Sequence, residues 1–408
     1  MSYLKMNFKK VNELNGSRVA ILYPQKGFAS NPTLVCVARE LQSAGAEVVV
    51  FSPDGDDAGT LPGVVHWPFP LWWRWRHGGV VQTLNYWKQW GWAKQHQIRN
   101  KGYAGFNLFI GANSEGLIQA DYLSRRWKVP LVYFSFEIFF RDEMACRSHR
   151  REKELEIEAS RRASLVLVQD ALRGEILARE NGLDPATLVC MPVASGGTAR
   201  MTQSNWLREQ LGISADTIIM LHSGAFANWT FAQELLECTL EWPENMRLVV
   251  HRNYSPGKGD KYGAMLTSGR YPRVTVHAKF LTPDEYENMV ASADLGLALY
   301  KPTPPSRYEQ KNLLYMGFSS GKLSMYAKHG LPIISVKQPF YAELIRQYQF
   351  GAVVDSFDQV ACAIMQIQSD NMKYRKEAMR LFNEKLSFNL HWPELRKRLE
   401  GLLGSAVH

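Results

Sequence analysis

A short run of small residues followed by a lysine carries the clearest chemical signal in the chain. Ser319-Ser320-Gly321-Lys322 opens a short helical pattern that ends at Gly330. A lysine is unfavourable at a helix N-terminus unless an anion lies there, because the unpaired backbone N–H groups already carry partial positive charge. Those N–H groups and the ammonium together form a phosphate receptor of two parts. The alternative is a solvated lysine on the surface.

Three other turns place polar groups or glycine where a ligand could approach. Ser223-Gly224 follows an apolar run, and this pair suits close contact with a sugar or a diphosphate. Arg252 ends the next such run, where a fixed guanidinium could reach a phosphate; a surface arginine is the alternative. Gly27 follows the first apolar run and lets the backbone approach a ligand ahead of a helix start, unless it only forms a tight turn.

These residues depend on a series of strands and helices to bring them together. Short apolar runs rich in Val, Ile and Leu alternate with helical patterns, which indicates parallel sheets covered on both faces. The series restarts after a polar stretch at 194–205. We expect strands at 18–23, 47–51, 107–110, 131–134, 165–168 and 188–191, and then at 217–221, 247–251, 274–276, 295–299, 332–336 and 352–354.

The pattern therefore predicts an α/β protein of two doubly wound, Rossmann-like domains. The N-terminal domain is expected at 1–197 and the C-terminal domain at 198–385, with a hinge near residue 197. Residues 386–408 should form a helical C-terminal tail that could cross back onto the first domain. Ligand should bind in a central cleft that the two domains face, at the carboxyl ends of the strands.

Length and composition exclude several classes of protein. The chain of 408 residues suits two domains, and its 46% hydrophobic and 21% charged residues exclude long-range disorder and collagen-like repeats. No apolar run approaches the roughly 18 residues of a membrane-spanning helix. Five scattered cysteines without a CxxC pair argue against a disulfide framework or a structural zinc site. In the absence of a secretory signal pattern, we expect a cytoplasmic protein.

One segment differs sharply from the rest of the chain in composition. Residues 58–114 contain no Asp or Glu, but they contain six of the basic residues and seven of the 12 tryptophans. Trp72, Trp73 and Trp75 alternate with arginines inside the Trp-rich basic segment at 66–101. Tryptophan favours the lipid headgroup boundary and basic side chains attract anionic lipids, so an anionic membrane surface is the expected partner. A glycan-stacking groove and aromatics packed in a helical insertion are the alternatives. Nucleic acid is not expected, because no RNA- or DNA-binding motif accompanies the basic residues.

The order of the motifs resembles glycosyltransferases of the B-type fold (GT-B), especially the family-4-like group. The strongest match is 317–334, where a small-polar turn, Lys-Leu and a short helix precede Gly-Leu-Pro-Ile. The resemblance extends over 340–354, over 274–300 and over 163–193, which includes Asp170 and Arg173. It covers most of the chain and is best from 217 to 355.

The resemblance implies a nucleotide-sugar donor bound to the C-terminal domain. The base would lie near Phe280 and Leu281. The diphosphate would lie near a set of small polar residues and the lysine, namely Ser223, Gly224, Ser319, Ser320, Gly321 and Lys322. Neither a metal nor a cofactor is expected, because cationic side chains and helix N-termini neutralise the diphosphate in this fold. The chain departs from the family in having Gly317 and Met325 where many members have a glutamate pair.

Two glutamates are candidates for contact with the sugars. Glu137 follows the strand at 131–134, and a carboxylate there could activate an acceptor hydroxyl or stabilise an oxocarbenium-like centre. Pairing with the nearby Arg141 is the alternative role for Glu137. Glu343 could contact the donor sugar or ribose, or it could simply complement the start of its helix.

The sequence thus predicts a glycosyltransferase that is peripheral on the inner face of the membrane. It would move a sugar from a nucleoside diphosphate to a lipid-linked or polysaccharide acceptor in cell-surface glycan synthesis, with the anomeric configuration retained by resemblance. Lys322, Arg252 and Glu137 are the expected catalytic residues, and Gly27 and the tryptophans are expected to bind the acceptor. The alternatives are a nucleotide-sugar epimerase of the same fold and a non-catalytic subunit that binds glycan or nucleotide.

Overall fold

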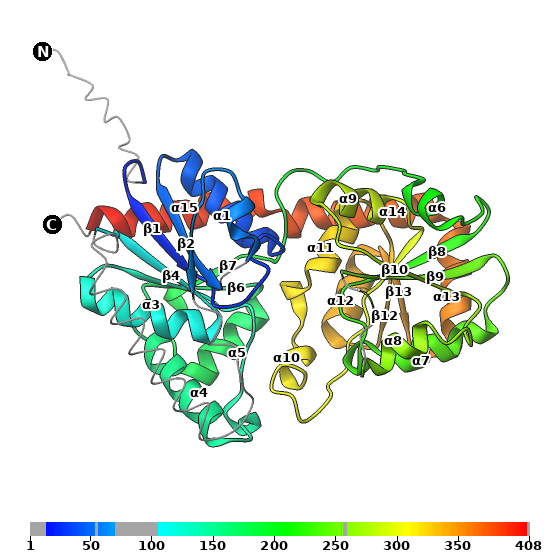
Figure 1. Ribbon diagram of the computed structural model, residues 1–408, viewed down its shortest axis with the longest axis horizontal. Coiled ribbons are helices and arrows are strands. Elements are labelled where there is room, and N and C mark those ends of the chain that lie inside the picture. Colours follow the sequence, from blue (N-terminus) through cyan, green and yellow to red (C-terminus); the bar gives the residue numbers. More distant parts are fainter. Residues whose placement is uncertain (1–13, 54–55, 70–104, 254, 256–258, 406–408) are drawn as a thin grey trace, which may run out of the picture.

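The chain folds into two α/β domains that lie side by side (Figure 1). The computed structural model describes residues 14–53, 56–69, 105–253, 255 and 259–405. Within these ranges the first sheet has seven parallel strands in the order β3-β2-β1-β4-β5-β6-β7, and the second has six in the order β10-β9-β8-β11-β12-β13. The expected fold class of two doubly wound domains with a helical C-terminal end is confirmed.

The elements of the first domain follow the alternation of the sequence. They are β1 (Arg18–Leu22), α1 (Pro32–Ser43), β2 (Glu47–Pro53), β3 (Val65–Phe69), β4 (Leu108–Ala112), α3 (Asn113–Trp127), β5 (Leu131–Phe134), α4 (Arg147–Ser160), β6 (Leu165–Val168), α5 (Ala171–Asn181) and β7 (Leu188–Cys190).

Successive residues of a strand point to opposite faces of its sheet, and β1 shows the consequence. Val19 and Ile21 belong to a core cluster that includes Leu34 of α1. Ala20 and Leu22 belong to a second cluster, which lies against α3 and α5. Both faces of the sheet are therefore buried, which explains why its strands are apolar at consecutive positions.

The second domain repeats this arrangement. Its elements are α6 (Trp206–Leu211), β8 (Ile218–Ser223), α7 (Ala232–Cys238), β9 (Met246–Arg252), α8 (Lys261–Leu266), β10 (Val274–Ala278), α9 (Pro283–Ala291), β11 (Leu295–Leu297), α10 (Lys311–Leu314), α11 (Gly321–Lys328), β12 (Ile333–Val336), α12 (Pro339–Tyr348), β13 (Gly351–Val354) and α13 (Val360–Ser369). One face of its sheet packs with α9, α11 and α12, and the other packs with α7 and α13.

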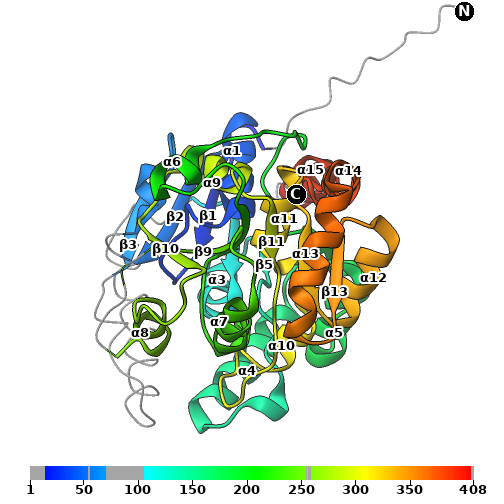
Figure 2. The same cartoon turned by 90° about the vertical axis from the view of Figure 1, so that its right-hand side faces the viewer.

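The C-terminal helices connect the second domain to the first. After α14 (Asn371–Leu381) and a π-helical turn, α15 (Phe388–Ser405) runs along the first domain (Figures 1 and 2). Trp392, Leu395 and Leu399 of α15 are buried in the same cluster as Val19. Burial of each such side chain stabilises the arrangement by about 1.5–3 kcal/mol. In the linker, the Gly197 N–H donates to Asn389 Oδ1 at 2.8 Å.

Several elements were not expected from the sequence, and β3 and α10 show the physical reasons. β3 contains Pro68, which has no backbone N–H to donate to a neighbouring strand. A proline is tolerated there because β3 is the edge strand of its sheet and pairs with β2. α10 has only four residues, too few to show a helical period. No helix in the described ranges is long and apolar enough to cross a membrane.

Candidate functional site

The turn before α11 is held by hydrogen bonds of its own. Ser320 is buried and caps the helix, because its hydroxyl oxygen accepts from the Leu323 N–H at 3.3 Å. The same hydroxyl lies 2.7 Å from the hydroxyl of Tyr300. Ser319 donates to the carbonyl oxygen of Met316. Since these serine hydroxyls are occupied within the protein, the first-turn N–H groups of α11 other than that of Leu323 are what the turn can offer to an anion.

Lys322 lies in the first turn of α11, and its ammonium is buried. Nζ has no hydrogen-bond partner within the described part of the chain, and it lies 5.4 Å from the centre of the Tyr300 ring. Burial lowers the pKa of Lys322 to about 8. Burial and the nearby Lys322 together lower the pKa of His222 to about 3, so this neighbour is a neutral imidazole. A buried cation without an anionic partner is unfavourable, and an anionic ligand would relieve that penalty.

The end of β8 lies against the same turn. Tyr326 of α11 accepts from the Ser223 N–H at 3.2 Å and donates to the Leu221 carbonyl at 3.1 Å, which ties β8 to α11. Gly224 has a φ of 98°, and a Cβ there would meet nothing within 4 Å. The Ser223 hydroxyl is 2.8 Å from the hydroxyl of Tyr286. The structure thus brings Ser223, Gly224 and the α11 turn together.

The other residues expected in the second domain differ in burial, and two of them form ion pairs with neighbouring side chains. Arg252 is buried and forms an ion pair of 2.6 Å with Asp260, which caps α8. Phe280 is 71% exposed after β10, whereas Leu281 packs partly against the core. Glu343 is exposed on α12 and pairs with Arg346, which lowers the pKa of the carboxyl. Its expected contact with a sugar therefore competes with a surface ion pair.

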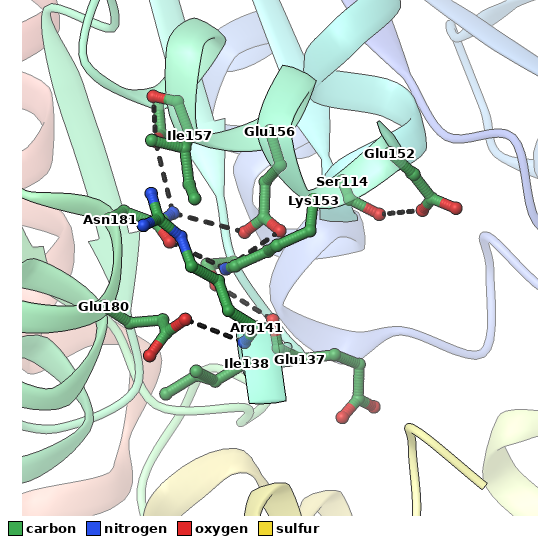
Figure 3. Close-up of polar contacts among 12 residues, drawn as sticks. Ser114, Glu137, Ile138, Arg141, Glu152, Lys153, Glu156, Ile157, Glu180 and Asn181 are labelled. Carbon is green, nitrogen blue, oxygen red and sulfur yellow. Dashed lines mark hydrogen bonds and ion pairs between the residues drawn. The ribbon is translucent and has the colours of Figure 1, made fainter. Parts of the chain in front are cut away.

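Glu137 lies just beyond the carboxyl end of β5. Its side chain and that of Arg141 point in opposite directions (Figure 3), and the Arg141 backbone N–H donates to Glu180 instead. The Glu137 carboxylate accepts from Nδ2 of Asn312, a residue of the second domain. Burial raises the pKa of Glu137, while Arg173 and the hydrogen bond from Asn312 oppose that shift.

A buried polar network supports the end of β5 (Figure 3). Lys153 of α4 forms an ion pair with Glu156 at 3.2 Å and donates to Asn181 of α5 at 2.7 Å. Tyr133 of β5 donates to Glu156 at 3.0 Å. Glu156 also accepts from β5, and Lys153 also donates to α5. The network therefore ties α4 and α5 to the strand that precedes Glu137.

The loop after β1 is fixed by its own neighbours. Gly27 has a φ of 88°, and its N–H donates to Asp56 Oδ1 at 2.6 Å. Asn113, the first residue of α3 directly after β4, has a φ of 55°; its side chain accepts from the Phe136 N–H and donates to Gln25. A non-glycine residue with a positive φ, in the left-handed backbone region, often marks a functional site. Asn113 was not expected from the sequence, where its only signal is a polar side chain directly after an apolar run.

The acceptor-binding tryptophans expected from the sequence, Trp72, Trp73 and Trp75, lie outside the described residues.

The segment 307–318 of the second domain docks onto the first domain. Arg173 of α5 is fully buried; it donates to the Tyr315 carbonyl at 2.6 Å and to Asn312 Oδ1 at 3.3 Å. Asp170 accepts from the Phe318 N–H at 3.0 Å, and Arg307 pairs with Glu152 at 2.9 Å. These contacts could not be expected from the sequence, because contacts between distant segments leave no periodic signal. The docked segment leads directly into the Ser320-Lys322 turn.

Gly317 offers a direct test of this docking. Its φ is 49°, and a Cβ there would lie 2.1 Å from Asp170 Oδ2. We expect Gly317→Ala to displace the carboxylate and to lower the free energy of unfolding by about 2–4 kcal/mol, as measured in urea. Gly269→Ala is the matched control, because Gly269 also has a positive φ (74°) but a Cβ there meets nothing within 4 Å. Equal losses in the two variants would contradict the proposed contact.

Among the described residues, no group of three or more His, Cys, Asp or Glu side chains is arranged to hold a metal ion.

Residues 262–392 match the family model of the glucosyltransferase 3-like C-terminal domain. No curated protein matches the chain by sequence. Among solved structures, Anabaena HepE in complex with UDP-glucose is 15% identical with a TM-score of 0.70, over 94% of this chain and 99% of that chain. Sucrose-phosphate synthase from Thermosynechococcus elongatus is 14% identical with a TM-score of 0.67, over 95% and 100%. WaaG, a glycosyltransferase involved in lipopolysaccharide biosynthesis, is 16% identical with a TM-score of 0.64, over 94% and 99%. The resemblance to the GT-B fold is confirmed.

Proposed function

We propose that this chain is a glycosyltransferase that uses a nucleoside diphosphate sugar as its donor. The observation that carries the proposal is the buried ammonium of Lys322 in the first turn of α11, which has no hydrogen-bond partner among the described residues and lies near His222, two residues before Gly224. This pairing of a cation with a helix N-terminus is suited to a diphosphate. The family-model match at 262–392, which includes α11, supports the same interpretation.

In the proposed reaction, the bond between the anomeric carbon and the diphosphate oxygen breaks, and the acceptor oxygen bonds to that carbon. Lys322 and the N–H groups of α11 stabilise the negative charge that develops on the leaving diphosphate. Glu137, in its ionised form, takes the acceptor proton or stabilises the oxocarbenium-like centre. We further propose that the anomeric configuration is retained and that no metal is needed, since the protein supplies the neutralising charge.

The donor and acceptor classes follow from different observations. HepE is described with UDP and with UDP-glucose, so uridine diphosphate sugars are the first donors to test. The acceptor is proposed to be lipid-linked or a polysaccharide, because the Trp-rich basic segment has the composition of a membrane-surface element. Flotation with anionic and with neutral vesicles tests this part; equal recovery from both would remove it.

The test of the function is a donor panel incubated with cell-envelope lipid or glycan, with release of nucleoside diphosphate and glycosylated product measured together. A transferase releases diphosphate only when an acceptor is present, and EDTA should leave the rate unchanged. Proton NMR of the new linkage reports whether the configuration is retained. An epimerase would interconvert sugars without an acceptor, and a binding subunit would shift in melting temperature with ligand but release nothing.

The affinity for uridine diphosphate should fall as the pH rises above about 8. The pKa of Lys322 is about 8 in the unliganded protein, so above that pH the ammonium loses its proton and its attraction for the anion. The loss should approach tenfold per pH unit until the pH reaches the higher pKa that bound diphosphate gives this lysine. Isothermal titration calorimetry from pH 7 to 10 measures it. Lys322→Arg is the control, because a guanidinium stays charged throughout; an equal slope in this variant would contradict the assignment.

A further inference from the structure

Asn312 of the second domain reaches a carboxylate of the first domain. It is 2% exposed, and it lies in α10, within the docked segment 307–318. Its Oδ1 accepts from the Ile138 N–H at 3.0 Å and from Arg173 at 3.3 Å. Two donors on one atom fix which way the amide faces, so Nδ2 must be the atom that donates to Glu137.

Within the described ranges, the polar groups that interact with Glu137 lie on three elements or at their ends. Arg173 of α5 provides the positive charge, and Asn312 of α10 provides a neutral donor. Tyr23, at the end of β1, is the third; burial raises its pKa to about 12, with smaller contributions from Asp56, Asp57 and Glu137. Burial disfavours ionisation of Glu137, so the charged form depends on Arg173 and on the amide of Asn312.

The position of Asn312 depends on contacts between the domains. Beside it, the Lys311 N–H donates to Glu143 at 3.0 Å, and the Lys311 ammonium pairs with Asp142. On its other side, the Tyr315 carbonyl is held by Arg173. The chain then continues to the turn that carries Lys322. One segment therefore connects the carboxylate of the first domain with the phosphate-binding turn of the second.

We propose that Asn312 is a positioning residue that orients the Glu137 carboxylate and keeps it ionised from across the domain boundary. Glu137 is then competent only while the segment 307–318 is docked. The proposal rests on the proposed function for the role of Glu137, but the state of its carboxyl can be measured without any reaction.

The experiment uses Asn312→Asp in the full chain. Aspartate has the same shape and keeps an acceptor for Ile138 and Arg173, but it replaces the amide donor with a second carboxyl beside Glu137. The δ-¹³C NMR signal of Glu137, assigned by its absence in Glu137→Gln, should titrate at least about one pH unit higher than in the parent protein. Asn245→Asp is the matched control, because Asn245 is exposed just before the amino end of β9. In this variant, Glu137 should titrate as it does in the parent protein.

The kinetic readout separates positioning from a structural role. With an active donor and acceptor, the acid limb of the kcat/KM profile should move upward by the same amount, and kcat should fall while the KM for the donor stays within about twofold. In the Glu137→Gln background, Asn312→Asp should produce no further shift. An unchanged NMR titration overturns the role of Asn312 whether or not the protein transfers sugar. Absence of turnover in the parent protein, with the NMR shift present, counts against the glycosyltransferase proposal alone.

Discussion

Replacing Lys322 with alanine should reduce kcat/KM for the nucleotide-sugar donor by about a thousandfold. Removal of one preorganised group that stabilises developing charge in a catalytic site lowers the rate by about 10²–10³, and here the ground-state affinity for the diphosphate is lost as well. Because the buried ammonium has no hydrogen-bond partner in the described part of the chain and only faces the Tyr300 ring, its removal should destabilise the unliganded protein little. Initial rates over a range of donor concentrations, with melting curves for both proteins, measure the two effects.

Lys337→Ala is the matched control for Lys322→Ala. Lys337 is 77% exposed and forms a surface ion pair with Asp355, so both activity and stability should stay near those of the parent. If Lys322→Ala instead lowered the melting temperature markedly and left donor affinity unchanged, the lysine would be a structural residue. The anion site at α11 would then be wrong.

Replacing Arg173 with methionine should destabilise the protein more than any of the other substitutions. The guanidinium donates to Gln169 and to the carbonyls of Phe136 and Tyr315, and all of these contacts are largely buried. Methionine fills much of the volume but leaves these acceptors unpaired. We expect the free energy of unfolding in urea to fall by about 3–5 kcal/mol. Hydrogen exchange should speed up in 312–318, because one of its anchors on the first domain is gone.

Arg179→Met provides the comparison on the same helix. Arg179 is exposed on α5, so its replacement changes the charge of the helix without removing a buried contact, and its effect should be within about 0.5 kcal/mol. If hydrogen exchange in 312–318 were equally slow in Arg173→Met and the parent, the segment would be held by its own domain, and Arg173 would not anchor it.

Several features of the site were predictable from sequence because they depend on neighbours along the chain. Ser320, Gly321 and Lys322 precede a short helical pattern, and α11 does begin at Gly321 with Ser320 as its cap. Gly224 follows an apolar run, and it does lie at the end of β8. These predictions succeed because caps, turns and strand ends are local properties that residue types and spacing record directly.

Other features of the site could not be predicted in this way. Nothing in the sequence indicates that Asn312, 175 positions after Glu137, donates a hydrogen bond to the Glu137 carboxylate. Arg141 was the alternative partner for Glu137 because it is near in sequence, yet its side chain points the opposite way (Figure 3). Arg252 was a candidate for phosphate contact, and only the fold shows that Asp260 lies beside it.

Residue types and their spacing were enough to indicate two parallel sheets, the alternation of strands and helices, and the lysine at a helix start, because periodicity and turn chemistry act over a few residues. The tertiary structure alone decided which charged and polar groups lie close to one another. The Lys322 ammonium is buried without a hydrogen-bond partner among the described residues, whereas Glu137 depends on the opposite domain. The reason is physical: burial and electrostatic interactions depend on distance in space, and residues far apart in the chain become neighbours only when the two domains dock.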